Sequence, residues 1–233
     1  MFAGCATNQT SIPSTAIPVG ATDWIVVDPP QPSPRVTFPD KQTGQDVTKA
    51  WAQLSNPEIL NLISDTHSEI SVAKLEAGGK VTYLVAQATA GVGTYRVVLD
   101  YSDYIVEDAV DPNSHQKIGM ARVGVGLRMT ATITTTTANI DLGSLLALGV
   151  AANLKQVKGT MSVDSIGIRI AGAGGPILSN ATIDETSIQK TLEAIAVIQS
   201  KIADSTTHLD PQALWVKPNS PSVKPSEVVK SLL

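Results

Sequence analysis

The chain has 233 residues, a formal net charge of −4, 42% hydrophobic residues and only 4% aromatic ones. This length fits one large domain or two small ones, and the core must be built from aliphatic side chains. The acidic balance offers no electrostatic basis for nucleic-acid binding, so we expect no nucleic-acid partner.

At the N-terminus, Met1-Phe2-Ala3-Gly4-Cys5 contains the only cysteine of the chain. Phe-Ala-Gly-Cys resembles the lipobox that ends a bacterial lipoprotein signal. The resemblance implies a lipid on Cys5, attachment to a membrane, and a place in the bacterial cell envelope. Because Ala6 and not aspartate follows, it implies the outer membrane, on its periplasmic or its surface face. The alternative is an unmodified Cys5, although the polar residues 7–11 are not typical of a core.

Residues 6–42 are rich in proline, which fixes φ and removes an amide donor. We therefore expect residues 1–42 to form the lipobox remnant and an extended tether. Within it, Trp24-Ile25-Val26-Val27 is apolar enough to dock on the domain as an edge strand. Residues 218–233 repeat the proline-rich pattern, and we expect a flexible C-terminal tail there.

Residues 43–217 are expected to form a single domain that begins with helices. Val47, Ala50, Trp51 and Leu54 recur at helical spacing, which predicts a helix over residues 45–54. Asn56-Pro57 then predicts the start of a second, short helix, with Asn56 as its N-cap.

Strands are predicted at residues 70–75, 81–85 and 94–106. In the last of these, the apolar positions change parity near Ser102-Asp103, which indicates a bulge or a bend. The clearest element is a strand over residues 121–133, where every odd position is apolar and every even one is Arg, Gly or Thr. This strict alternation predicts one buried face and one solvent-exposed face.

The second half of the domain alternates helices and strands. Residues 142–154 are apolar nearly all round, which predicts a deeply packed helix capped by Asn139 or Asp141. A strand at residues 160–170 changes parity again and predicts a second bulge. A helix follows Thr182 and Glu185, and residues 213–216 form a last strand, at a sheet edge. The fold class is α+β: a mostly antiparallel, bent and bulged sheet of about five strands with helices packed against it.

No constellation of catalytic residues stands out. The three histidines lie in predicted loops or at element ends, and zinc, hydrolase and redox motifs are missing. The glycine-rich residues 171–175 lack the phosphate-loop lysine, and Asp108, Asp111 and Asn113 do not keep calcium-loop spacing. We therefore predict no catalytic residue, no cofactor and no metal. Asp100, Asp103 and Glu107 leave a carboxylate-based enzyme as an alternative.

The even-numbered face of the long strand is a candidate binding surface. Four of its residues could contact a partner: Arg122, Arg128, Thr130 and Thr132. The alternative is that the two arginines are solvated charges that keep a long strand from pairing wrongly.

One further resemblance covers about residues 80–217. Residues 119–137, with Gly-Leu-Arg-Met-Thr-Ala-Thr at their centre, the helix at 142–154 and Gly159-Thr160-Met161-Ser162-Val163 resemble the core of the cholesterol-dependent cytolysins, which are related to the perforins. The resemblance implies helices that can unfold into membrane hairpins.

The leading interpretation is a non-enzymatic cell-envelope lipoprotein that acts as a binding or assembly module. Its partners would be the membrane, through Cys5, and an envelope protein or further copies of itself. A pore-forming or membrane-remodelling protein is the first alternative, and the carboxylate enzyme is the second.

Overall fold

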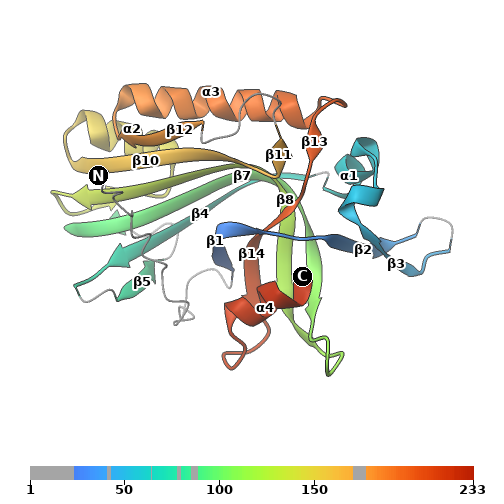
Figure 1. Cartoon of the computed structure of the whole chain (residues 1–233). Coiled ribbons are helices and arrows are strands. Elements are labelled where there is room, and N and C mark those ends of the chain that lie inside the picture. Colours follow the sequence, from blue (N-terminus) through green and yellow to red (C-terminus); the bar gives the residue numbers. More distant parts are fainter. Residues whose placement is uncertain (1–23, 41–42, 64, 78–79, 85–88, 170–176) are drawn as a thin grey trace, which may run out of the picture.

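The computed structural model describes residues 24–40, 43–63, 65–77, 80–84, 89–169 and 177–233, so Cys5 and the glycine-rich residues 171–175 lie outside the described part. At its centre is a sharply bent antiparallel sheet of eight strands (Figure 1). Six strands follow one another in the order β1 (Ile25–Pro32), β14 (Gln212–Pro218), β8 (Lys117–Thr135), β7 (Gly93–Val110), β4 (Asp65–Leu75) and β5 (Val81–Leu84). The two others are β10 (Val157–Ile166), which pairs with β8, and β12 (Leu178–Thr182), which pairs with β10.

The remaining elements are short strand pairs and helices. The pairs are β2 (Arg35–Pro39) with β3 (Asp46–Ala50), β6 (Thr89–Ala90) with β9 (Ile140–Asp141), and β11 (Ile168–Arg169) with β13 (His208–Leu209). The helices are the 3₁₀ turn η1 (Trp51–Gln53), α1 (Asn56–Leu62), α2 (Leu145–Asn153), α3 (Glu185–Ile202) and α4 (Pro225–Leu232). This content confirms the α+β class, with about eight strands in the main sheet and not five.

Strand β8 carries the bend because its two halves have different partners on one side. Residues 126–135 pair with β10, whereas residues 119–124 pair with β14, and β7 accompanies both halves on the other side. Gly124 and Gly126 lie where the partners change, and a Cβ on either would clash with backbone carbonyl oxygens of β7. Only glycine allows the strands to approach this closely at the corner.

The odd-numbered face of β8 is buried as the alternation predicts. Leu127, Met129 and Ile133 have no exposed surface. Helix α3 lies along the part of the sheet that β8, β10 and β12 form (Figure 1). Ile188, Ala194 and Ile198 on one side of α3 are buried in the same core. Burial of this aliphatic face is the main source of the fold's stability.

The two parity changes do not come from bulges. The β7–β8 register runs without a shift from Gly93 to Ala109, and the β10–β8 register runs unbroken from Val157 to Ile166. Tyr104 and Ile166, the residues out of phase, lie opposite Gly124 and Gly126 and form a second apolar cluster with Leu214 and Trp215. The bulge predicted near Ser102-Asp103 is therefore wrong and the predicted bend is right, because the glycines leave room for a second core on the even-numbered face. In β10 the register does shift toward β12, between Met161 and Val163, which lies before the parity change.

The predicted helix over residues 45–54 is also wrong. Residues Asp46–Ala50 form β3, which pairs with β2 in register from Pro39↔Asp46 to Arg35↔Ala50. The neighbouring β2 strand offers ladder hydrogen bonds that the helical pattern cannot reveal, and β-branched residues suit a strand. Trp51 and Leu54 are still buried, but from the short turn η1.

Other helices are present but begin at different residues from those predicted. Ser55 caps α1 and forms a capping box with Glu58, Ser144 caps α2, and Asp184 caps α3. Helix α2 is not deeply packed: Leu146, Val150 and Leu154 are 68%, 60% and 62% exposed. These three positions lie one turn apart and form an exposed apolar stripe, while Leu145, Leu148 and Ala151 face the core.

Both chain ends contribute more structure than the sequence predicts. Trp24-Ile25-Val26-Val27 docks as an edge strand, as expected, but β1 and β2 also continue through residues assigned to the tether. In the expected tail, α4 packs its buried Val228 against the sheet, close enough that a side chain at Gly119 would touch it. With β1 at the edge, β14 lies inside the sheet and not at its margin. Within the described part, no helix has the length and apolar character to cross a membrane.

Candidate functional site

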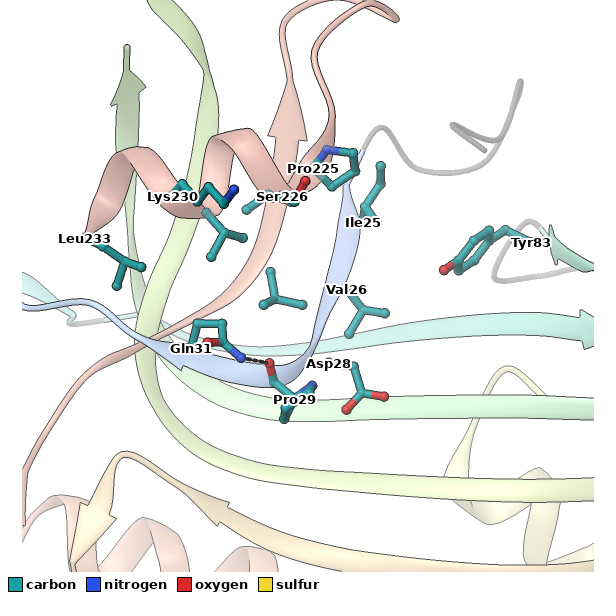
Figure 2. Close-up of a pocket in the computed structure, with 13 residues that line it drawn as sticks. Ile25, Val26, Asp28, Pro29, Gln31, Tyr83, Pro225, Ser226, Lys230 and Leu233 are labelled. Atoms are coloured by element: carbon teal, nitrogen blue, oxygen red, sulfur yellow. Dashed lines mark hydrogen bonds between the residues drawn. The ribbon is translucent and has the colours of Figure 1, made fainter. Parts of the chain in front are cut away.

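An apolar pocket opens where the two ends of the described chain meet. It lies between β1 and α4, and Tyr83 of β5 stands farther along (Figure 2). Val216 of β14 also lines it. Its volume is about 410 Å³. Small-molecule sites are typically concave, mostly apolar and within this range of sizes, with a few polar groups that fix orientation.

The local sequence explains how each wall forms. Strand β1 pairs with β14 through Ile25↔Val216 and Val26↔Trp215, and the register then shifts before Gln31. Helix α4 starts with Pro225 and a Lys224–Glu227 capping box. Because successive helical residues point about 100° apart, Val228 faces the sheet, and Val229 lies on the side that lines the pocket.

Several polar side chains stand around this apolar pocket. Asp28 forms an ion pair with Arg96, and Gln31 donates to the Pro29 carbonyl oxygen at 3.0 Å. Burial raises the pKa of the Tyr83 hydroxyl, which therefore stays protonated at neutral pH. Lys230 and Ser226 line the pocket from α4, one helical turn apart.

A second cavity, of about 490 Å³, lies beside the first and shares Asp28 and Pro29 with it. Its lining is polar and includes Arg96, Arg128, Thr130, Asp164 and Gln212. Burial raises the pKa of the Asp164 carboxyl, and the charge of Arg128 opposes that rise.

Arg128 lines the polar cavity, and its guanidinium group donates hydrogen bonds to other residues of the protein. Its Nε and Nη2 donate to the Asp100 carboxylate at 2.7 and 2.5 Å, and Trp215 Nε1 donates to the same carboxylate at 2.8 Å. Nη2 also donates to the Leu214 carbonyl oxygen at 3.2 Å, and Nη1 donates to that of Val27. This buried cluster ties β1 and β14 to β7 and β8.

The expectation that Arg128 faces solvent is therefore wrong, since it is only 2% exposed. Strands β1 and β14 cover the even-numbered face at the corner, where the carbonyl oxygens of Val27 and Leu214 accept hydrogen bonds from Arg128. Of the other predicted surface residues, Thr130 also lines the polar cavity, while Thr132 is exposed. Arg122 lies apart from them: it pairs with Glu69 at 2.7 Å and stacks over the Trp24 ring at 4.2 Å.

The three candidate catalytic carboxylates, Asp100, Asp103 and Glu107, do not converge on one site. Asp100 is held by Arg128 and Trp215, and Asp103 is on the opposite face of β7, because side chains alternate along a strand. Glu107 is buried, one of its oxygens has no hydrogen-bond partner, and burial raises its pKa to about 8. The arrangement therefore provides no pair of carboxylates for acid–base catalysis.

The other candidates have structural roles in the described part of the chain. Asp111 accepts hydrogen bonds from the Asn113 and Ser114 amides and closes a turn, and Asp108 pairs with Lys117. His67 stacks on Tyr104 with ring centroids 4.5 Å apart. No group of three or more acidic, histidine or cysteine side chains gathers as a metal site among the described residues.

Half of the apolar pocket was identifiable in the sequence and half was missed. The apolar island at Trp24–Val27 marks β1, whereas α4 lies in the expected tail. The available signal was Pro225 at a helix start, Glu227 at its third position, and Val228, Val229 and Leu232 at helical spacing behind them. Compared with protein-family models, with curated proteins and with solved structures, the chain gives no match.

Proposed function

We propose that this protein is a non-enzymatic binding module that holds a small ligand with an apolar body in the pocket between β1 and α4. The supporting observation is the pocket itself, with its volume of about 410 Å³ and its aliphatic walls from Ile25, Val26 and Val229. The side-chain carboxylate that lines it, Asp28, forms an ion pair with Arg96, so the site favours binding over catalysis.

A neutral dye that fluoresces in apolar surroundings tests this proposal. The protein is expected to bind N-phenyl-1-naphthylamine with one-to-one stoichiometry. Val229→Trp, which fills the pocket, should weaken binding at least tenfold. Val197→Trp is the matched control, because Val197 on α3 is 52% exposed and does not line the pocket. Equal binding by the two variants, each shown by circular dichroism to be folded, would refute the proposed site.

We further propose that Cys5 carries the lipid that anchors this module in the cell envelope, on the basis of the lipobox resemblance. Mass spectrometry of the full-length precursor expressed in bacteria should then find a diacylglyceryl group on Cys5. An unmodified Cys5 would contradict the anchor and leave the binding site unaffected.

A pore-forming function is the second candidate, and the exposed apolar stripe of α2 favours it. Helix α2 connects β8 to β10, and these strands are paired neighbours whose ladder ends at Thr135↔Val157. If residues 136–156 continued that ladder, each arm would gain about ten residues, or ~33 Å, which matches a hydrocarbon core of ~30 Å.

A disulfide can test whether α2 must refold. A Cβ at Gly149 would lie 3.9 Å from that of Ile188 on α3, which suits a disulfide. In a Cys5→Ser background, Gly149→Cys with Ile188→Cys should leak dye from liposomes when reduced and not when oxidised. Absence of leakage by the unmodified and the reduced protein would reject the pore.

A further inference from the structure

We infer that the ligand of the apolar pocket is a single-chain carboxylate amphiphile whose head group pairs with Lys230, an inference that rests on the proposed binding function. The geometry that points to this ligand is the placement of Lys230 at a pocket whose lining is mostly aliphatic.

Lys230 forms no ion pair with another described residue. Several cations form ion pairs, including Arg96 with Asp28, Arg122 with Glu69 and Lys117 with Asp108. No carboxylate oxygen of the described chain comes within ion-pair distance of the Lys230 ammonium. A ligand carboxylate can therefore pair with this lysine without displacing another group.

Asp28, the side-chain carboxylate that lines the pocket, does not oppose an anion strongly. Its carboxylate is held by Arg96, and Arg128 Nη1 lies 4.0 Å away. These guanidinium groups offset its charge, which leaves Lys230 as the side-chain cation that can pair with an incoming anion. A cationic amphiphile would meet the opposite situation, because its head would compete with two arginines for Asp28.

Lys230 and Ser226 form one head-group site on the same side of α4. They are four residues apart, which places them on adjacent turns of the helix, and Figure 2 shows them side by side above the apolar side chains. The ammonium can pair with one carboxylate oxygen while the Ser226 hydroxyl donates to the other. The chain of the ligand would then extend past Val229 toward Ile25 and Val26 of β1.

Matched ten-carbon probes distinguish the head group from the chain. Decanoate and 1-decanol, below their aggregation limits at pH 7.5 and low salt, are each titrated against protein-bound N-phenyl-1-naphthylamine. Lys230→Gln should weaken decanoate binding roughly two- to fivefold, the range of a partly exposed ion pair. Decanol binding should stay unchanged, and 0.5 M salt should remove most of the difference.

Lys224→Gln is the matched control, because it removes the same charge from the start of α4, outside the pocket lining. It should change neither affinity. If Lys230→Gln leaves decanoate binding intact, or weakens decanol equally, the head-group assignment is overturned while the apolar site stands. If the dye binds but decanoate does not displace it, the ligand class is also wrong. If the dye itself does not bind, the proposed function fails, and this inference fails with it.

Discussion

The two faces of β8 are held in place by different kinds of interaction. On the odd-numbered face, Leu127, Met129 and Ile133 are buried by packing alone. On the even-numbered face at the bend, the buried group is Arg128, with Asp100 and Trp215 as its hydrogen-bond partners. Apolar burial adds stability in proportion to area. A buried ion pair instead fixes geometry, because its desolvation offsets much of its attraction.

This difference assigns separate tasks to the two faces. The odd-numbered face stabilises the sheet as a whole. The Arg128 cluster fixes where β1 and β14 cross the corner, since the guanidinium donates to the backbone of both strands at Val27 and Leu214. Because β1 forms a wall of the apolar pocket, the cluster also positions the proposed binding site.

The largest effect should come from breaking the buried pair. Asp100→Ala leaves Arg128 charged and without its carboxylate, and it is expected to cost about 3–5 kcal/mol in the free energy of unfolding. The double variant Asp100→Leu with Arg128→Met should cost less than Asp100→Ala, because no charge is left buried. Urea denaturation measures both. A double variant as unstable as the single one would show that the cluster stabilises by attraction and not by geometry.

Truncation on the odd-numbered face should cost nearly as much. Leu127→Ala removes a fully buried side chain and is expected to lower the free energy of unfolding by about 2–5 kcal/mol. Asp100→Ala should weaken dye binding, because it disturbs the cluster that positions β1. Leu127→Ala should leave dye binding unaltered in urea-free buffer, because Leu127 does not line the pocket. If folded Leu127→Ala lost dye binding, the odd-numbered face would also position the pocket, and the two faces would not have separate roles.

Glu107 contrasts with Asp100, which has Arg128 as its partner. Both are buried carboxyl groups on β7, but one oxygen of Glu107 has no hydrogen-bond partner. Burial raises its pKa to about 8 in the folded protein, above the value of about 4.3 for an exposed glutamate. The folded state then holds a proton that the unfolded state has lost, so stability falls as the pH rises between these two values.

Glu107→Gln removes this titration and should therefore raise stability by a few kcal/mol at pH 8.5. At pH 4 the carboxyl is protonated in the folded state and largely so in the unfolded state, so the variant should match the unmodified protein. Thermal melts at the two pH values measure the difference. An equal effect of the substitution at both values would show that Glu107 finds a partner when ionised.

The smallest effect is expected beyond the corner, where the even-numbered face of β8 meets solvent. Thr132→Ala should change the free energy of unfolding by well under 1 kcal/mol, because the side chain is exposed. Denaturant melts beside Leu127→Ala provide the test. Similar losses in the two variants would mean that another layer covers Thr132 in solution.

Elements with a local sequence pattern could be predicted before the structure was known. Strict alternation marked β8 and its buried face, Asn56-Pro57 marked α1 to within one residue of its cap, and the Trp24–Val27 island marked β1. These signals are local, because periodicity and capping depend on neighbours along the chain.

The other features could not be predicted, because contacts between distant segments outweighed local preference. Helical spacing at Val47 and Trp51 yielded to pairing with β2, and the parity of Tyr104 and Ile166 followed from two glycines on another strand. Arg128 is buried because β1, about a hundred residues earlier, folds over it. The apolar pocket likewise exists only where β1 and α4, from opposite ends of the described chain, come together.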